Sequence, residues 1–149
     1  MLKVAFVCLG NICRSPMAEA IFRQMTVERG ISDSVEVDSF GTSDEEEGNA
    51  IYPLALKTLE SHGITAKHTA KKITAKDVAR FDYIVVMERR HLGQVLMLTS
   101  GKYSEKVMTL RQTDVVDPWY TRNFEKAYAD IYDGCAELIE KISDKIATE

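Results

Sequence analysis

The sequence predicts an α/β fold in which βαβ units surround a parallel sheet. Short β-branched apolar segments alternate along the chain with longer amphipathic ones, which is typical of parallel strands joined by helices. The chain has 149 residues, 45% of them hydrophobic, which is enough for one well-formed core and too little for two ordinary domains. We therefore expect a single domain over residues 1–149.

Four short apolar segments are the predicted strands. They are bounded by glycine, serine or charged residues and are too short for ordinary helices. The predicted strands are Lys3–Val7, Val35–Asp38, Tyr83–Val86 and Lys106–Thr109. In a doubly wound sheet ligands bind at the carboxyl ends of the strands, so the residues after the first strand are of special interest.

Amphipathic stretches between the strands predict the helices. The first is expected over Pro16–Arg29, with proline in its first turn and Gly30 as its stop. The second is expected over Pro53–His62, where Gly63 ends the pattern. The remaining predictions are a short turn from Thr74, a segment near Glu88–Leu96, and Asn123–Ala147.

One apolar stripe runs along the last predicted helix. Its members recur at steps of three and four residues, which places them on one face of a helix. They are Phe124, Tyr128, Ile131, Cys135, Leu138, Ile142 and Ile146. We therefore expect Cys135 to be a core residue without a catalytic role.

The loop between the first strand and the first helix carries the chemistry. It begins at Cys8, where the apolar run ends, and Arg14 follows in a Cys-x5-Arg spacing, with Ser15 placed to cap the helix. Backbone N–H groups of such a loop can point into one concavity, and the helix dipole there favours negative charge. The pattern predicts a phosphate-binding loop.

Cys8 and Arg14 suit phosphoryl transfer together. A free cysteine thiol is mostly protonated at neutral pH, but the loop amides, the helix N-terminus and Arg14 would all stabilise a thiolate at Cys8. The guanidinium can hold two equatorial phosphate oxygens at once, which a lysine could not do with the same geometry. Cys8 could also be an ordinary buried cysteine at the end of a strand. We favour the nucleophile, because Arg14 follows at the matching spacing.

The segment Cys8–Ser15 and the pair Asp117-Pro118 resemble the two motifs of the low-molecular-weight protein tyrosine phosphatases. Segments 39–42 and 81–87 and the overall length also match, so the resemblance spans nearly the whole chain. It implies the Rossmann-like phosphotyrosine phosphatase I fold, a single domain with a four-stranded parallel sheet and helices on both faces.

The resemblance also implies the role of each residue in the site. Cys8 would be the nucleophile that forms a cysteinyl-phosphate, Arg14 the transition-state stabiliser, and Asp117 the general acid and then base, with phosphotyrosine and small aryl phosphates as substrates. Asn11 would hold a strained loop conformation, and Ser15 would bond the Cys8 sulfur as well as, or instead of, capping the helix. The implied substrate-binding residues are Leu9, Gly10, Asn11, Ile12, Cys13, Ser15 and Trp119.

Composition argues against several other functions. The net charge of −4 gives no global basic field for nucleic acid or an anionic membrane. Three scattered histidines without acidic residues at ligand spacing lead us to expect neither a metal nor a cofactor. Three cysteines, two of them in the loop, suit a reducing compartment, so we expect a cytoplasmic protein. The resemblance implies that its partners are phosphotyrosine-containing proteins or peptides.

The chain departs from the family in ways that leave alternatives open. Glu45 stands where relatives usually carry an aromatic wall of the cleft, and Phe40 or Tyr52 is a candidate replacement. If Glu45 rims the cleft, it favours basic phosphopeptides. Tyr120 matches the second of two tandem tyrosines that kinases modify in some relatives. Cys13 is either the partner of Cys8 in a protective disulfide or a small buried residue.

Three rival functions share these motifs in whole or in part. A protein arginine phosphatase has the same fold and loop, but those relatives typically place Thr where this chain has Ile12. A thioredoxin-coupled arsenate reductase needs a further cysteine pair, which Cys135 alone does not supply. A phosphotyrosine-binding module would need neither the nucleophile nor the acid.

Overall fold

The computed structural model describes residues 1–147, so the last two residues of the predicted domain lie outside the described residues. Its sheet has four parallel strands in the order β2-β1-β3-β4. They are β1 (Leu2–Cys8), β2 (Val35–Gly41), β3 (Tyr83–Val86) and β4 (Val107–Thr109). The predicted parallel sheet is confirmed, and β1, which ends at Cys8, is a central strand.

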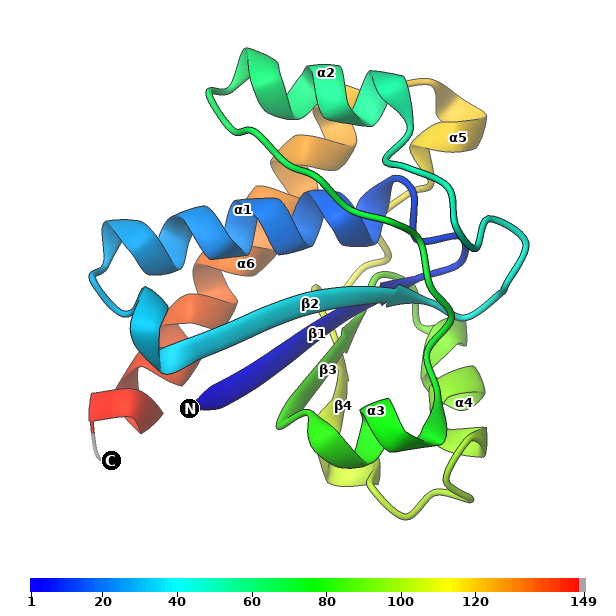
Figure 1. Ribbon diagram of the computed structural model, residues 1–149, viewed down its shortest axis with the longest axis vertical. Helices are drawn as coiled ribbons and strands as arrows, with labels where there is room; N and C mark the ends of the chain where they lie inside the picture. Colours follow the sequence, from blue (N-terminus) through cyan, green and yellow to red (C-terminus); the bar gives the residue numbers. More distant parts are fainter. Residues whose placement is uncertain (148–149) are drawn as a thin grey trace.

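Helices cover both faces of the sheet, as expected (Figure 1). One face carries α1 (Arg14–Glu28), α2 (Pro53–Ser61) and α6 (Phe124–Ala147). The other carries α3 (Ala75–Arg80) and α4 (Arg90–Met97). Short 3₁₀ turns precede β2 and β4, at Ser32–Ser34 and Ser104–Lys106.

Strand β1 is buried on both faces, which explains its continuous apolar sequence. Val4, Phe6 and Cys8 face the core under α1 and α6, whereas Ala5 and Val7 face the core under α3 and α4. This alternation turns the side chain of Cys8 towards α1, at the carboxyl end of the sheet.

The apolar stripe of α6 packs on α1 as the pattern predicts. Its members are buried except Ile146, which is half-buried. Cys135 has no exposed surface, and burial raises the pKa of its thiol far above the ordinary value. It is a core residue, as expected. Among residues 1–147, no helix is both long and apolar enough to cross a membrane.

Two predicted features near the site are wrong. Helix α1 begins at Arg14, two residues before Pro16, and its N-cap residue Cys13 makes no side-chain capping bond. Ser15 therefore lies inside the first turn and does not cap the helix; its own N–H is directed at the Cys8 sulfur, 3.4 Å away. A short helix that the sequence pattern did not predict, α5 (Pro118–Thr121), follows Asp117.

Candidate active site

A pocket opens at the carboxyl end of β1, where the phosphate-binding loop turns into α1. Three segments that are distant in sequence form its walls: the loop Cys8–Arg14, the two glutamates Glu45 and Glu46, and the segment that carries Asp117, Trp119 and Tyr120. The structure thus brings together all the residues predicted for the site except Ser15, which is buried behind Cys8 and does not line the pocket.

The sulfur of Cys8 lies among hydrogen-bond donors. The Asn11 N–H is 3.3 Å from it and the Ser15 N–H 3.4 Å, and the Ser15 hydroxyl is 3.0 Å away. These groups lie at or just before the start of helix α1, so the sulfur faces several polar hydrogens at once. Cys8 itself is 3% exposed, so its reactive surface faces the pocket alone.

Asn11 holds the loop in a conformation that few residues adopt. Its φ is 61°, in the left-handed region, and its side chain is buried. Its amide donates to the hydroxyls of Ser15 at 2.8 Å and Ser39 at 3.1 Å, and its Oδ1 accepts from the Lys71 N–H at 3.0 Å and lies 2.8 Å from His68 Nε2. These bonds over-determine the backbone of the loop.

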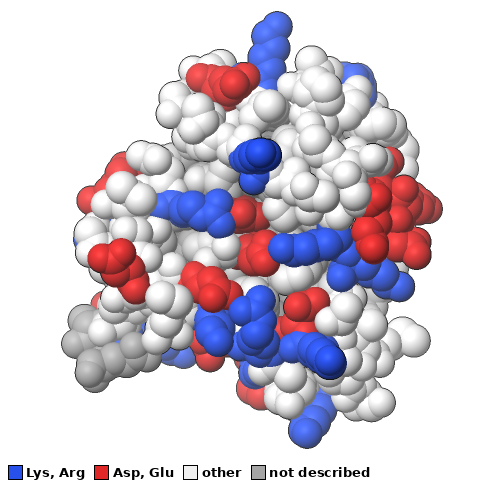
Figure 2. Space-filling view, in the orientation of Figure 1, with Lys and Arg blue, Asp and Glu red and all other residues white. Residues whose placement is uncertain are grey.

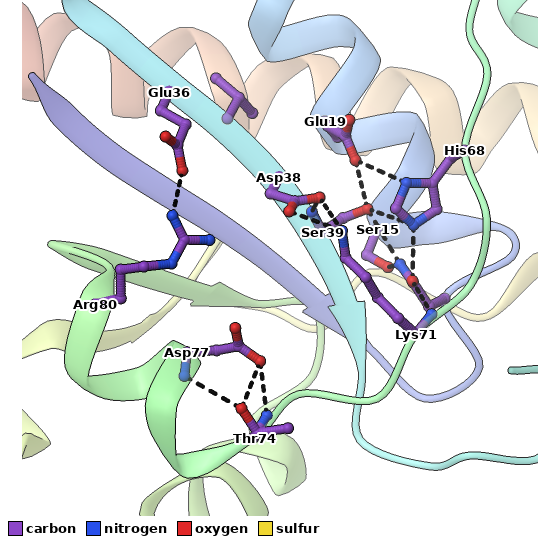
Figure 3. A network of polar contacts seen from close by, with 12 residues as sticks. Ser15, Glu19, Glu36, Asp38, Ser39, His68, Lys71, Thr74, Asp77 and Arg80 are labelled. Atoms are coloured by element: carbon purple, nitrogen blue, oxygen red, sulfur yellow. Dashed lines mark hydrogen bonds and ion pairs between the residues drawn. The ribbon is translucent and has the colours of Figure 1, made fainter.

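A polar network under α1 supports Asn11, and Figure 3 shows how its side chains converge. The hydroxyl of Ser39 donates to Glu19 Oε1 at 2.6 Å, and His68 Nδ1 lies 3.3 Å from the same oxygen. Burial lowers the pKa of His68, although the carboxylate of Glu19 acts in the opposite direction. Sequence spacing gave no sign that this histidine would reach the loop.

The same network contains a possible set of metal ligands that the sequence pattern missed. Ligand atoms of Glu19, Asp38 and His68 lie within 4.8 Å of one another. Each already has protein partners, however: Asp38 pairs with Lys71 Nζ at 2.8 Å, and Glu19 accepts from the Ser39 hydroxyl. Their contacts match a structural hydrogen-bond network, and the group is not needed for the chemistry of the pocket.

Arg14 is buried and faces two carboxylates. Its Nη1 donates to the Val115 carbonyl at 2.7 Å, and its Nη2 lies 2.9 Å from Glu88 Oε2 and 3.3 Å from Asp117 Oδ2. Burial acts to raise the pKa of Glu88, but hydrogen bonds from Arg90 and Arg14 outweigh it and the pKa lies below its usual value. Glu88 is therefore ionised at neutral pH and holds the guanidinium in place.

Asp117 reaches the pocket from the start of α5. Its Oδ1 accepts from the Trp119 N–H at 3.0 Å, which makes it the N-cap residue of that helix, and its Oδ2 faces Arg14. The backbone of Asp117 is extended, as expected before proline. One carboxylate oxygen is thus fixed by the helix while the other is directed into the site.

The rim of the pocket is acidic on one side and aromatic on the other. Glu45 and Glu46 come from the loop after β2, and acidic side chains gather at that edge of the molecule in Figure 2. The close approach of this loop requires glycine at Gly41, because a Cβ there would lie 2.8 Å from the carbonyl oxygen of Leu9. Basic and acidic groups are interspersed elsewhere on the face shown.

Neither candidate replacement for the missing aromatic wall lines the pocket. Phe40 is 3% exposed and packs edge-on against Phe81 in the core on the far side of the sheet. Tyr52 packs edge-on against Trp119, with ring centroids 4.9 Å apart, and so supports the aromatic side already present. The expectation that Phe40 replaces the wall is wrong, because the period-2 alternation of β2 turns it to the other face.

Cys13 lies in the loop as a buried free thiol. Burial and the neighbouring Cys8 raise its pKa to about 12, so it is a protonated, poorly nucleophilic thiol in this state. The described residues contain no disulfide. The protective disulfide with Cys8 stays a prediction.

Sequence reasoning missed two residues that act on the pocket. Glu46 lines it beside Glu45, and Glu88 contacts Arg14. A signal for Glu88 existed: it follows β3 by two residues, and the carboxyl ends of neighbouring parallel strands meet at one edge of a sheet.

Comparison with known proteins places this geometry in a family. The model of the low molecular weight phosphotyrosine protein phosphatases matches residues 3–148. The low molecular weight protein-tyrosine-phosphatase YfkJ of Bacillus subtilis (strain 168) is 35% identical over 95% of this chain and 96% of its own length. The low molecular weight phosphotyrosine protein phosphatase of Sus scrofa is 37% identical over 94% and 95%.

Solved structures agree with the sequence matches. The crystal structure of YfkJ superposes with a TM-score of 0.94 at 35% identity and covers 97% of this chain and 96% of that one. The structure of DARP, a drosophila arginine phosphatase, gives a TM-score of 0.87 at 30% identity and covers 94% and 97%. Since the family model and relatives above 30% identity span almost the whole sequence, the chain belongs to the low molecular weight phosphotyrosine protein phosphatase family.

Proposed function

We propose that the chain hydrolyses phosphotyrosine in proteins or peptides, the activity of its family, with Cys8 as nucleophile, Arg14 as transition-state stabiliser and Asp117 as general acid and base. The observation that carries the proposal is the convergence of these three groups. Asp117 Oδ2 lies 3.3 Å from Arg14 Nη2, and Cys8 lines the same pocket as both residues. Binding alone would require neither a nucleophile nor an acid.

The reaction has two steps. In the first, the Cys8 thiolate attacks phosphorus in line with the ester oxygen, the P–O bond breaks, and Asp117 gives its proton to the leaving phenolate. In the second, Asp117 accepts a proton from water, which attacks the cysteinyl-phosphate, so that the S–P bond breaks and phosphate leaves. Arg14 follows the charge on the equatorial oxygens through both steps.

The pocket supplies separate groups for the phosphate and the ring. In this proposal the backbone N–H groups of the loop Leu9–Cys13 and the guanidinium of Arg14 bind the phosphate oxygens, and all of these residues line the pocket. Ile12 and Trp119 offer apolar surface to the phenyl ring of the substrate. Neither step needs a metal or an organic cofactor, because the thiolate is the nucleophile and the carboxylate moves the proton.

Arginine dephosphorylation is the second candidate. Glu45 and Glu46 at the rim favour it, since carboxylates complement the guanidinium of phosphoarginine better than an aromatic wall does. Ile12 and Trp119, which line the same pocket, favour the aryl substrate, because they offer apolar surface to a phenyl ring. We rank phosphotyrosine first on the apolar lining.

Phosphate release from a phosphotyrosine peptide and from a phosphoarginine protein, measured with a chelator present, tests both candidates. The parent chain is compared with Cys8→Ser and with Cys135→Ala, a matched control whose thiol is buried in the core. We expect turnover of phosphotyrosine that Cys8→Ser abolishes and Cys135→Ala retains. Preference for phosphoarginine would select the second candidate, and tight binding without Cys8-dependent release would overturn both.

The cellular setting belongs to the same proposal. We infer that the chain acts as one domain in the cytoplasm, where its three thiols stay reduced. Tyr120 is 76% exposed beside the pocket and is accessible to a regulatory kinase. A phosphate on Tyr120 would add negative charge beside Asp117 and beside the pocket. Because this charge also repels acidic substrates, we expect activity towards them to fall first.

A further inference from the structure

Arg122 has a strained backbone for which the reaction gives no reason. Its φ is 61° and its ψ 13°, the left-handed conformation that ends helix α5, with its N–H donating to the Pro118 carbonyl at 2.8 Å. Glycine adopts this conformation without steric cost, whereas a side chain with a Cβ does not. An arginine in this position indicates that its side chain compensates for the strain.

The guanidinium of Arg122 lies among three aromatic rings. Its Cζ is 5.4 Å from the ring centroid of Tyr52, 5.9 Å from that of Trp119 and 5.6 Å from that of Phe124. Its Nη2 donates to the Tyr52 hydroxyl at 2.8 Å, and its Nη1 is 3.5 Å from the Trp119 carbonyl oxygen. A planar cation can stack on several rings and hydrogen-bond in its plane at once.

These rings lead directly to the pocket. Trp119 lines the cleft, is 44% exposed and gives the N–H that fixes Asp117 Oδ1. Tyr52 packs edge-on against Trp119 and ties its own backbone N–H to the Ile12 carbonyl of the phosphate loop at 2.9 Å. Arg122 therefore bridges the aromatic side of the cleft to the loop that binds phosphate.

We propose that Arg122 is a positioning residue that fixes the orientation of Trp119 and thereby the affinity of the cleft for an aryl group. The inference rests on the proposed function and extends it to the specificity of the same pocket. An exposed tryptophan without this support would sample several rotamers and offer the substrate ring no fixed wall. Besides Ile12, the cleft is lined by two glutamates and two aromatic residues, and Trp119 is the aromatic residue that Arg122 contacts.

The test uses the fluorescence of Trp119, the single tryptophan of the chain. Arg122→Gly removes the side chain and accepts the same backbone conformation, so the fold should persist. We expect lower anisotropy of Trp119 without substrate. KM for a phosphotyrosine peptide should rise about two- to five-fold with kcat within about twofold, the range expected when cation–π contacts are lost. The competitive inhibition constant of inorganic phosphate, which has no ring, should stay unchanged.

Two further variants sharpen the result. Arg122→Lys keeps the charge and the strained backbone but loses the planar donor group, so it should shift both quantities in the same direction as Arg122→Gly. Tyr52→Phe removes the hydroxyl that Arg122 bonds and should give a smaller shift in that direction.

Clear outcomes would overturn the proposal. Unchanged anisotropy and KM in Arg122→Gly, with a higher melting temperature, would mean that Arg122 only ends helix α5. A parent-like Arg122→Lys would mean that charge alone acts. If Arg122→Gly fails to fold, the test rests on Tyr52→Phe. Trp119 anisotropy and KM equal to those of the parent in that variant would refute the positioning role. The anisotropy is measured without substrate, so a chain inactive on phosphotyrosine would refute the proposed function and leave this test intact.

Discussion

The phosphate-binding loop and the rim of the cleft border one pocket but are built in opposite ways. In the loop, Asn11 and Arg14 are each 1% exposed, and their polar atoms are bonded on several sides. At the rim, Trp119 is 44% and Tyr120 76% exposed. Buried, mutually bonded groups permit one geometry, whereas exposed groups tolerate change. Changes in the loop should therefore lower turnover of every substrate, and changes at the rim should alter the choice among substrates.

The largest effect is expected for Arg14→Lys. The ammonium cannot replace the guanidinium that contacts Val115, Glu88 and the phosphate together, so kcat should fall about 10³-fold on phosphotyrosine and small aryl phosphates alike. Steady-state kinetics on both substrates measure this. Arg29→Lys, an exposed change at the other end of α1, is the control and should leave kcat unchanged. A loss of kcat below tenfold, or a loss confined to one of the two substrates, would contradict the proposed difference between loop and rim.

Asn11→Ala should have the next largest effect. It removes the bonds to Ser15, Ser39 and Lys71 and leaves a Cβ residue at φ 61° with fewer contacts to hold it. We expect kcat to fall about 10- to 100-fold and the free energy of unfolding to fall by about 2–3 kcal/mol, measured by urea denaturation.

Asn11→Gly separates the two causes of that loss. Glycine relieves the backbone strain but not the missing hydrogen bonds, so this variant should regain about 1 kcal/mol of stability without regaining kcat. Recovery of full kcat in Asn11→Gly would mean that the backbone conformation alone matters, and that the network shown in Figure 3 does not organise the loop.

The same contrast explains what sequence reasoning could and could not predict. Local patterns were sufficient to predict the strands, the position of Cys8 at the end of a central strand and the buried stripe of α6. These patterns are the spacing of apolar residues and the glycines and prolines that begin or end an element. The contacts of Asn11 with His68 and with the Lys71 N–H join segments more than fifty residues apart. No local pattern encodes such distances.

Ser15 shows a different limit. A serine before proline at the start of a helical pattern is a sound signal for an N-cap. Here the Cys8 sulfur accepts from the Ser15 N–H in the first turn of α1, and the Ser15 hydroxyl lies 3.0 Å from the same sulfur. The N-cap rule therefore failed for Ser15, because the contact with the Cys8 sulfur takes the place of an ordinary helix cap.

His91 makes the loop side of the pocket sensitive to acid. Its ring has no exposed surface, and its nitrogens have no hydrogen-bond partner within residues 1–147. Burial lowers its pKa from 6.5 to about 4, with Glu88 acting against this and Arg14 in support. Since the unfolded chain binds the proton more tightly, stability falls as the pH drops from about 6.5 and levels off near 4.

His91→Leu should flatten this dependence. The contribution of His91 between pH 7.5 and pH 5 is about 2 kcal/mol, so the variant should lose that much less stability over the interval, measured by urea denaturation at both values. His62→Gln is the control, because that imidazole is partly exposed at the surface beside Glu125. Equal slopes in the parent and His91→Leu would show that another group senses the acid.

The smallest effect is expected at the rim, from Glu45→Gln combined with Glu46→Gln. Both carboxylates line the pocket, so we expect them to attract basic residues next to a phosphotyrosine. Their loss should lower kcat/KM about threefold for peptides with Lys or Arg flanks and raise it about threefold for peptides with acidic flanks. Because exposed charges are screened, both changes should shrink in 0.5 M salt.

Glu47→Gln is the matched control for these substitutions, since Glu47 carries the same charge one residue further along the loop but does not line the pocket. It should leave the ratio between the two peptides unchanged. If Glu47→Gln alters that ratio as much as the double variant does, the effect comes from the charge of the whole loop. If the double variant lowers kcat equally on both peptides, the two glutamates support the phosphate loop, as the packing of Glu46 against Gly10 would allow. Changes at the rim would then alter turnover itself and not the choice among substrates.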